Sequence, residues 1–167
     1  MSKKIIFISG VCGVGKSAIC NYINNNKLLN NYVVFDIDDL DNINNYNKDE
    51  GNLFYENSIK KALNKSEDKN IIIGSCINTN DYEKINFSKE IESYTSILIT
   101  CSNEELTKRL KVRDKSRNCS SDEFMEEQME YQEYLFSNLD LFNLHLDNTN
   151  TSIEDIANKI VEYIKRA

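Results

Sequence analysis

Apolar runs of strand length alternate along the chain with amphipathic stretches of helix length. Each run is short, rich in β-branched residues and bounded by polar turns, which is typical of strands buried in a parallel sheet. The runs are Ile5–Ser9, Tyr32–Ile37, Asn70–Gly74, Ser96–Cys101 and Phe142–Leu146. Helical stretches between them predict an α/β fold: a single doubly wound domain over residues 1–167, with a five-stranded parallel sheet and helices on both faces.

Apolar spacing also predicts where two of the later helices lie. Apolar residues recur at helical spacing over residues 153–164, and Thr151 with Glu154 has the spacing of a capping box at the start of that helix. Residues 121–140 are rich in glutamate, with apolar positions spaced as on a helix. In a sheet of this class the ligand lies at the carboxyl ends of the strands, so candidate residues are sought there.

Composition narrows the class of partner. The formal net charge is −7 and the sequence pI is about 4.8, whereas proteins that bind nucleic acid usually carry a basic face. No segment approaches the roughly 20 apolar residues that a membrane helix needs. Five scattered cysteines without a Cys-x-x-Cys pair indicate reduced thiols. We therefore expect a cytoplasmic protein with neither a nucleic-acid nor a membrane partner.

The segment after the first apolar run matches the pattern GxxxxGK(S/T), and we call residues Gly10–Ser17 the phosphate loop. Glycines let the backbone bend around an anion, and the amide groups and the positive end of the following helix then hold phosphates. We expect Lys16 to reach the β and γ phosphates of ATP and the Ser17 hydroxyl to ligate Mg²⁺. The predicted nucleotide contacts are Gly10, Val11, Cys12, Gly13, Val14, Gly15, Lys16, Ser17 and Ala18.

Other motifs separate the classes of phosphate-loop protein. The DxxG and NKxD motifs of GTPases are absent, and the chain is short for a motor or an oligomeric ATPase. What remains resembles the phosphate-loop small-molecule kinases, the group of nucleoside and nucleotide kinases, shikimate kinase and gluconate kinase. The resemblance covers most of the chain. It rests on the phosphate loop, Asp36-Ile37-Asp38, Arg109-Leu110-Lys111-Val112-Arg113 with Arg117, and the closing sequence LDNTNTSIEDIANKI.

Asp36 and Asp38 fall at the end of the second predicted strand. Residues two apart in an extended chain point the same way, so both carboxylates are expected to face the phosphate loop. The resemblance to shikimate kinase implies that the first carboxylate, Asp36, supports Mg²⁺ through water. It implies that the second, Asp38, orients or deprotonates the acceptor hydroxyl. The alternative is that these are turn residues on an acidic surface.

Three arginines follow the fourth predicted strand. Arg109 and Arg113 are four residues apart and are expected to share a helix face, with Arg117 in the connection beyond. The resemblance to nucleotide kinases implies that they open a lid over residues 114–121, the first arginine stacking on the base and the next contacting phosphates. The alternative is a solvated face on which Glu105 pairs with Arg109.

These observations predict an ATP-dependent kinase for a small-molecule hydroxyl or phosphate acceptor, most simply a nucleoside, a nucleotide or a small metabolite. Lys16, Asp38, Arg109 and Arg113 are the catalytic candidates, Ser17 and Asp36 the metal ligands, and ATP and Mg²⁺ the cofactors. The acceptor is expected to bind within residues 40–70, and the resemblance implies a monomer or homodimer. A nucleotide-binding regulatory module without an acceptor, and an antibiotic-modifying kinase, are the alternatives.

Overall fold

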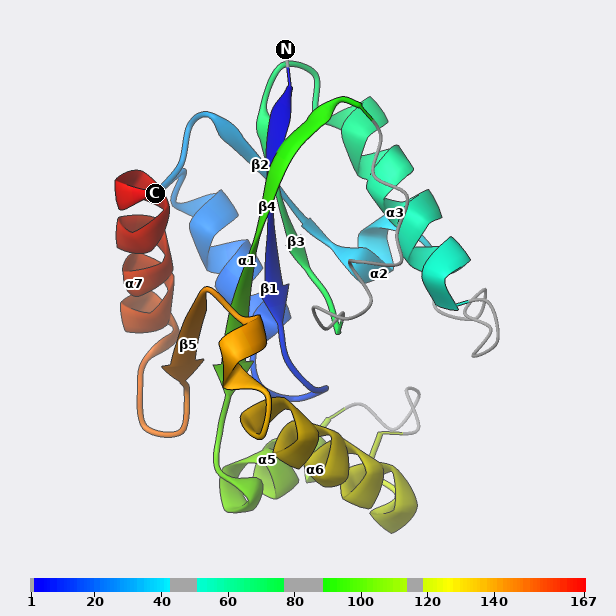
Figure 1. Cartoon of the computed structure of the whole chain (residues 1–167). Helices are drawn as coiled ribbons and strands as arrows, with labels where there is room; N and C mark the ends of the chain where they lie inside the picture. The colour runs from blue at the N-terminus through cyan, green and yellow to red at the C-terminus, as the bar shows by residue number, and fades with distance from the viewer. Residues whose placement is uncertain (1, 43–50, 77–88, 114–118) are drawn as a thin grey trace.

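The computed structural model describes residues 2–42, 51–76, 89–113 and 119–167. Its strands form one parallel sheet in the order β2-β3-β1-β4-β5 (Figure 1). The strand bounds are β1 (Lys3–Ser9), β2 (Tyr32–Asp36), β3 (Asn70–Gly74), β4 (Ile91–Thr100) and β5 (Leu144–Asp147). The predicted five-stranded, doubly wound α/β class is confirmed.

Helices cover both faces of the sheet, as the alternation of strand and helix patterns predicts. Their bounds are α1 (Lys16–Asn25), α2 (Ile37–Leu40), α3 (Gly51–Lys65), α5 (Asn103–Lys111), α6 (Asp122–Phe136) and α7 (Ile153–Arg166), with a 3₁₀ turn, η4, over Leu139–Leu141. In Figure 1, α1 and α7 lie on one side of the sheet, and α2 and α3 lie on the other. Across the ranges given above, no helix is long and apolar enough to cross a membrane.

Alternating residues of β1 enter two separate hydrophobic cores. Ile6 and Ile8 belong to the larger core, which α1, α5, α6 and α7 complete, whereas Ile5 and Phe7 belong to the smaller core beneath α2 and α3. All four side chains are at most 4% exposed. A strand that is buried on both faces has a continuous run of apolar residues in its sequence, and for this reason the apolar run predicted the position of β1.

The structure corrects several predicted boundaries. The cap of α7 is Ser152, whose hydroxyl accepts a hydrogen bond from the Asp155 amide at 3.0 Å, and not Thr151, whose hydroxyl donates to the Asp147 carbonyl at 3.1 Å. The helix predicted over 121–140 ends at Phe136 and is followed by the 3₁₀ turn. Shifts of up to about four residues are the usual uncertainty when apolar periodicity alone defines an end.

Strand order fixes what surrounds the phosphate loop. Central β1 lies between β3 and β4, and the chain crosses from one half of the sheet to the other between these two strands. The carboxyl ends of all the strands point toward the lower end of the molecule in Figure 1, where α5 and α6 also lie. Such a reversal of strand order leaves room for a ligand at this edge of the sheet.

His145 provides a test of the packing at the β5 edge. Its Nε2 atom lies 2.8 Å from the Thr100 hydroxyl, and the Phe136 ring packs against it edge-on, with centroids 5.5 Å apart. Burial lowers the pKa of His145, against the opposing effect of the Asp147 carboxylate. A lowered pKa means that the unfolded chain binds the proton more readily, so His145 should reduce the free energy of unfolding as pH falls below its ordinary value of 6.5.

We therefore expect the free energy of unfolding, measured by urea denaturation between pH 7.5 and pH 5.5, to fall less steeply with pH in His145→Gln than in the unsubstituted protein. The comparison is clean because the chain contains one histidine. Identical slopes for the two proteins would show that His145 titrates in the fold as it does in the unfolded chain.

Candidate active site

The phosphate loop joins β1 to α1 in a conformation with a positive φ at each of its three glycines, Gly10, Gly13 and Gly15. Gly10 has φ +148°, and a side chain there would overlap the carbonyl oxygen of Ile99 on β4. Gly15 has φ +104° and is the N-cap of α1, where a Cβ atom would lie 2.8 Å from the Asn148 amide nitrogen. The loop is thus pressed against β4 and against the segment after β5, with no room for larger residues.

The start of α1 is open to solvent and suited to an anion. The first amides of a helix have no partner within the helix, and they lie at the positive end of its dipole. Ser17 and Ala18 are exposed, and the first turn of α1 contains no acidic residue that would compete for the amides. The predicted phosphate-binding residues therefore have the arrangement that anion binding needs.

Lys16 folds back over the loop. Its ammonium donates hydrogen bonds to the carbonyl oxygens of Gly10 at 2.9 Å and Val11 at 2.8 Å. These contacts place the positive charge beside the first half of the loop, above the end of β1. A terminal phosphate group bound by the loop would meet the ammonium here.

Asp36 ends β2 directly opposite Gly74 of β3, which in turn pairs with Ile8 of β1. Its carboxylate accepts a hydrogen bond from the Asp38 amide at 3.1 Å and so caps α2. The chain therefore turns into a helix at Ile37, and the prediction that Asp36 and Asp38 share one face of an extended strand is wrong. Aspartate is a favoured N-cap, and Asp36 at this position starts the helix. Asp38 therefore lies in the first turn of α2, where it is exposed.

The charges of Asp36 and Lys16 meet around the thiol of Cys20 on α1. Burial, and to a smaller extent the Asp36 carboxylate, raise the pKa of Cys20 to about 12, although the Lys16 ammonium lowers it. A Cβ atom at Gly74 would lie 2.9 Å from the Cys20 sulfur and 3.8 Å from Lys16 Cβ. The carboxyl ends of β2 and β3 thus converge with the start of α1.

Arg109 binds the phosphate loop from α5. Its guanidinium donates to the Val14 carbonyl at 3.3 Å, to the Asn148 carbonyl at 2.8 Å and to the Glu105 carboxylate at 2.8 Å. The alternative ion pair with Glu105 is therefore present, Arg109 also contacts the loop, and its stacking on a nucleotide base stays a prediction. In-plane hydrogen bonds leave the flat faces of a guanidinium available for stacking, and the Arg109 side chain is 26% exposed.

Arg113 reaches the loop from beyond the end of α5. The helix ends at Lys111, so the two arginines do not share its face as predicted, yet Arg113 donates to the Cys12 sulfur at 2.8 Å. Arg117 and residues 114–118 of the predicted lid lie outside the described residues. At the other end of that predicted lid, Cys119 is buried in the larger core and Ser121 caps α6, so this part is packed.

Asn148, directly after β5, is a site residue to which the sequence analysis assigned no role. It is fully buried, and its side-chain amide donates to the Val14 carbonyl at 2.7 Å, while its own carbonyl accepts from Arg109. Its position at the carboxyl end of the last strand was the available clue. Nothing in the sequence showed that this end lies beside the phosphate loop, because β5 pairs with β4 and not with β1.

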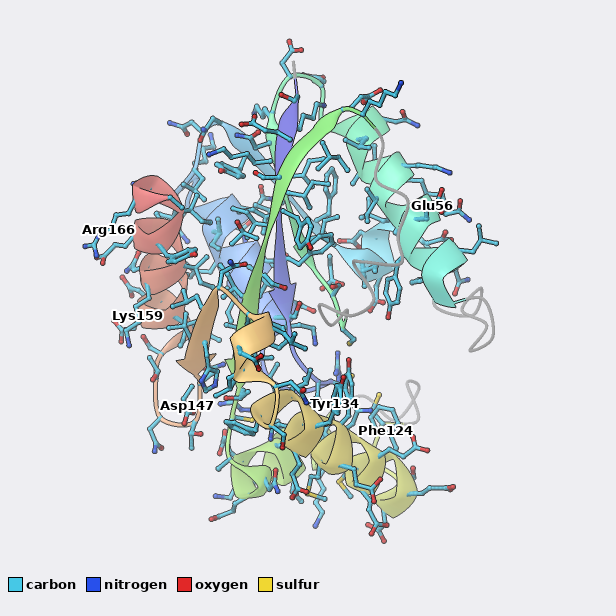
Figure 2. The ribbon with its side chains drawn as sticks, in the orientation of Figure 1. Glu56, Phe124, Tyr134, Asp147, Lys159 and Arg166 are labelled. Atoms are coloured by element: carbon cyan, nitrogen blue, oxygen red, sulfur yellow. The ribbon has the colours of Figure 1, made fainter. Side chains whose placement is uncertain are left out.

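Helix α6 was predicted, but its contacts with the site were not. Gln128 accepts a hydrogen bond from the Cys12 amide at 2.8 Å, and the Tyr131 hydroxyl donates to the Cys76 carbonyl, just after β3, at 3.2 Å. Figure 2 shows α6, with Phe124 and Tyr134 labelled, at the end of the molecule to which the strands point. Glutamine on a glutamate-rich helix has no sequence pattern that marks it as a partner of a distant loop.

Comparison with known proteins places the chain in a family. The family model described as an AAA domain matches residues 6–133. The chain belongs to this AAA domain family. The match contains the phosphate loop, Asp36, Asp38 and the three arginines of the sequence analysis, and it ends before Asn148. No curated protein matches the chain at a significant level.

Solved structures agree with this family in fold. A shikimate kinase from Bacteroides thetaiotaomicron has a TM-score of 0.66 at 14% identity, covering 96% of this chain and 98% of its own. A gluconokinase from Sinorhizobium meliloti 1021 has a TM-score of 0.67 at 14% identity, with coverage of 99% and 92%. A shikimate kinase from Acinetobacter baumannii in complex with shikimate has a TM-score of 0.62 at 13% identity, with coverage of 99% and 94%. The predicted P-loop kinase fold is confirmed over almost the whole chain.

Asn148 gives a direct test of how the phosphate loop is held. Asn148→Ala leaves the Val14 carbonyl without its amide donor, and we expect the free energy of unfolding to fall by about 1–3 kcal/mol in urea denaturation. Asn150→Ala, an exposed neighbour in the same connection, is the matched control and should change little. Equal stability of the two variants would contradict a clamping role for Asn148.

Proposed function

We propose that this protein is an ATP-dependent kinase that transfers the γ-phosphoryl group to a hydroxyl or phosphate of a small molecule. The observation that carries the proposal is that Lys16 and Asp36 both lie beside Gly74 and Cys20, at the open start of α1. The likeness over the full chain to structures named as shikimate kinase and gluconokinase supports it. The acceptor that we propose is a nucleoside, a nucleotide or a small metabolite, in line with the resemblance of the sequence to the phosphate-loop small-molecule kinases.

In this proposal, residues Gly10 to Ala18 bind the polyphosphate through backbone amides other than that of Cys12, which Gln128 holds. The Lys16 ammonium keeps its hydrogen bonds to the Gly10 and Val11 carbonyls and donates its third N–H group to a phosphate oxygen. Arg109 stacks on the base, while Arg113 and Arg117 contact phosphates. These cations stabilise the charge that develops on the transferred group. Ser17 and Asp36 would hold Mg²⁺, which supplies further neutralisation of the phosphates, and one or two carboxylates are enough for such a site.

Asp38 is the proposed base. The acceptor oxygen forms a bond to the γ phosphorus as the bond to the β-phosphate oxygen breaks and ADP leaves, while the hydroxyl proton passes to the Asp38 carboxylate. The acceptor is proposed to bind over residues 40–70. Within that span Phe54 is buried in the smaller core and Lys60 pairs with Glu56, so these two support the helix, while residues 43–50 lie outside the described ranges.

A nucleotide-binding regulatory module is the second candidate, favoured by one observation. Strand β3 ends at Gly74 and is followed by Ser75 and Cys76, without a carboxylate that could serve a metal. Nucleotide binding would then control a partner protein, without an acceptor. A kinase for an antibiotic hydroxyl would use the same groups as the leading proposal, so only the acceptor distinguishes it.

We propose a cytoplasmic location and a monomeric or homodimeric state for this kinase. All five cysteines are free thiols, which fits a reducing compartment. The acidic balance of the chain supports a small-molecule acceptor in preference to a nucleic acid.

The proposal is tested by incubating the protein and Mg²⁺ with γ-labelled ATP and a panel of nucleosides, nucleotides, sugar acids, shikimate and aminoglycosides. We expect label to appear on one acceptor class, and Lys16→Ala to reduce transfer by roughly a hundredfold or more, because it removes a preorganised cation from the transferred group. Label that moves only to water would favour the regulatory module. Absence of magnesium-dependent affinity for any nucleoside triphosphate would overturn both candidates.

Asp38→Asn separates chemistry from nucleotide binding. The amide cannot accept the hydroxyl proton, so turnover should fall by roughly 10²–10⁴-fold, the usual contribution of a general base, while the affinity for ATP barely changes. Asp39→Asn, one residue further along α2 and also exposed, is the control. If Asp38→Asn keeps the turnover of the control variant, another group is the base.

A further inference from the structure

One peptide unit of the phosphate loop is held from both sides. The carbonyl of the unit between Val11 and Cys12 accepts a hydrogen bond from the Lys16 ammonium at 2.8 Å. The N–H of the same unit donates to the Gln128 side-chain carbonyl on α6, also at 2.8 Å. A trans peptide is planar, with its oxygen and hydrogen on opposite sides, so the two bonds together fix the rotation of that plane.

We propose that Gln128 is a positioning residue for phosphoryl transfer. By holding the Cys12 N–H, it turns the Val11 carbonyl toward Lys16 and so sets where the ammonium meets the terminal phosphate. The inference rests on the proposed function, because it assigns a role within the same site. It concerns a residue that lies outside the phosphate-loop motif and contacts the loop from a distant helix.

Helix α6 is anchored well enough to serve as a fixed support. One turn after Gln128, the buried Gln132 accepts from the Cys101 amide at 3.1 Å and donates to the Cys101 carbonyl at 2.8 Å, at the end of β4. Tyr131 binds the segment after β3, as described above. The helix is therefore tied to the ends of two strands that flank β1, and Gln128 projects from it to the loop between them.

The loop residue that Gln128 holds also meets the arginine that precedes the predicted lid. Arg113 donates to the Cys12 sulfur at 2.8 Å, so both the amide and the side chain of Cys12 have partners from elements on either side of residues 114–118. Lys16 contacts the Gly10–Val11 end of the loop, and in phosphate-loop proteins this lysine reaches the β and γ phosphates. Loss of the Gln128 contact should therefore weaken the binding of ATP, which offers Lys16 both a β and a γ phosphate, more than that of ADP, which offers only the β phosphate.

The test compares ATP with ADP in Gln128→Met, which keeps the length of the side chain and removes the acceptor. Affinities are measured calorimetrically in the presence of Mg²⁺. We expect the affinity for ATP to fall by about tenfold, the equivalent of one hydrogen bond to an ordered group, and the affinity for ADP to change by less than about twofold. Turnover with the acceptor that the labelled-ATP panel identifies should fall at least as much as the affinity for ATP.

Gln132→Met is the matched control, because it makes the same change one turn along α6 and breaks contacts with Cys101, just after β4, and with Asn103 of α5, not with the phosphate loop. It should lower the melting temperature and leave the ratio of ATP to ADP affinity unchanged. An equal change of that ratio in both variants would overturn the inference, since loosening of α6 would then explain it. The inference would also be overturned if Gln128→Met had the same ratio of ATP to ADP affinity as the unsubstituted protein.

The experiment distinguishes failure of the proposed function from failure of the role proposed for Gln128. If the unsubstituted protein binds neither nucleotide, the proposed function and this inference fall together. If it binds ATP and ADP and transfers phosphate to no acceptor, the ratio still tests Gln128, and only the kinase proposal is lost.

Discussion

The active site depends on the backbone of one short loop being held by side chains from elsewhere in the chain. Between β1 and α1 the backbone makes neither a sheet nor a helix, so its polar groups need other partners if the loop is to keep one shape. Lys16 supplies donors from the following helix, Asn148 and Arg109 bind the Val14 carbonyl, and Gln128 accepts from Cys12. Because these groups are already bound, the loop keeps one shape, and amides other than that of Cys12 are left for a ligand.

The order of the strands makes these contacts possible. With β1 in the centre, the loop that leaves it lies between the ends of β3 and β4, and residues that are distant in sequence reach it from both sides. Asp36 and Gly74 approach from the β2–β3 half, and Arg109 and Asn148 approach from the β4–β5 half. This division matches the proposed chemistry, in which the acceptor and metal lie on one side of the terminal phosphate and the base of the nucleotide on the other.

Two of the predicted functional groups have a structural role as well. Asp36 caps α2, and Arg109 braces the loop through Val14 and pairs with Glu105. A residue with both roles ties the stability of the fold to the geometry of the site. For that reason the Asp38 and Gln128 substitutions, which leave these braces in place, are the more informative probes of chemistry.

The sequence by itself determined the sheet class, the phosphate loop and the residues at the ends of β1 and β2, because buried parallel strands and a glycine-bearing anion loop have strong local patterns. The resemblance to nucleotide kinases singled out Arg109 and Arg113, but their contacts with the phosphate loop were not predicted. Only the tertiary structure decided that Asp38 lies in the first turn of a helix and that Asn148 and Gln128 bind the loop. Strand order and helix docking are set by interactions between residues far apart in the chain, and such interactions leave no periodic pattern in the sequence.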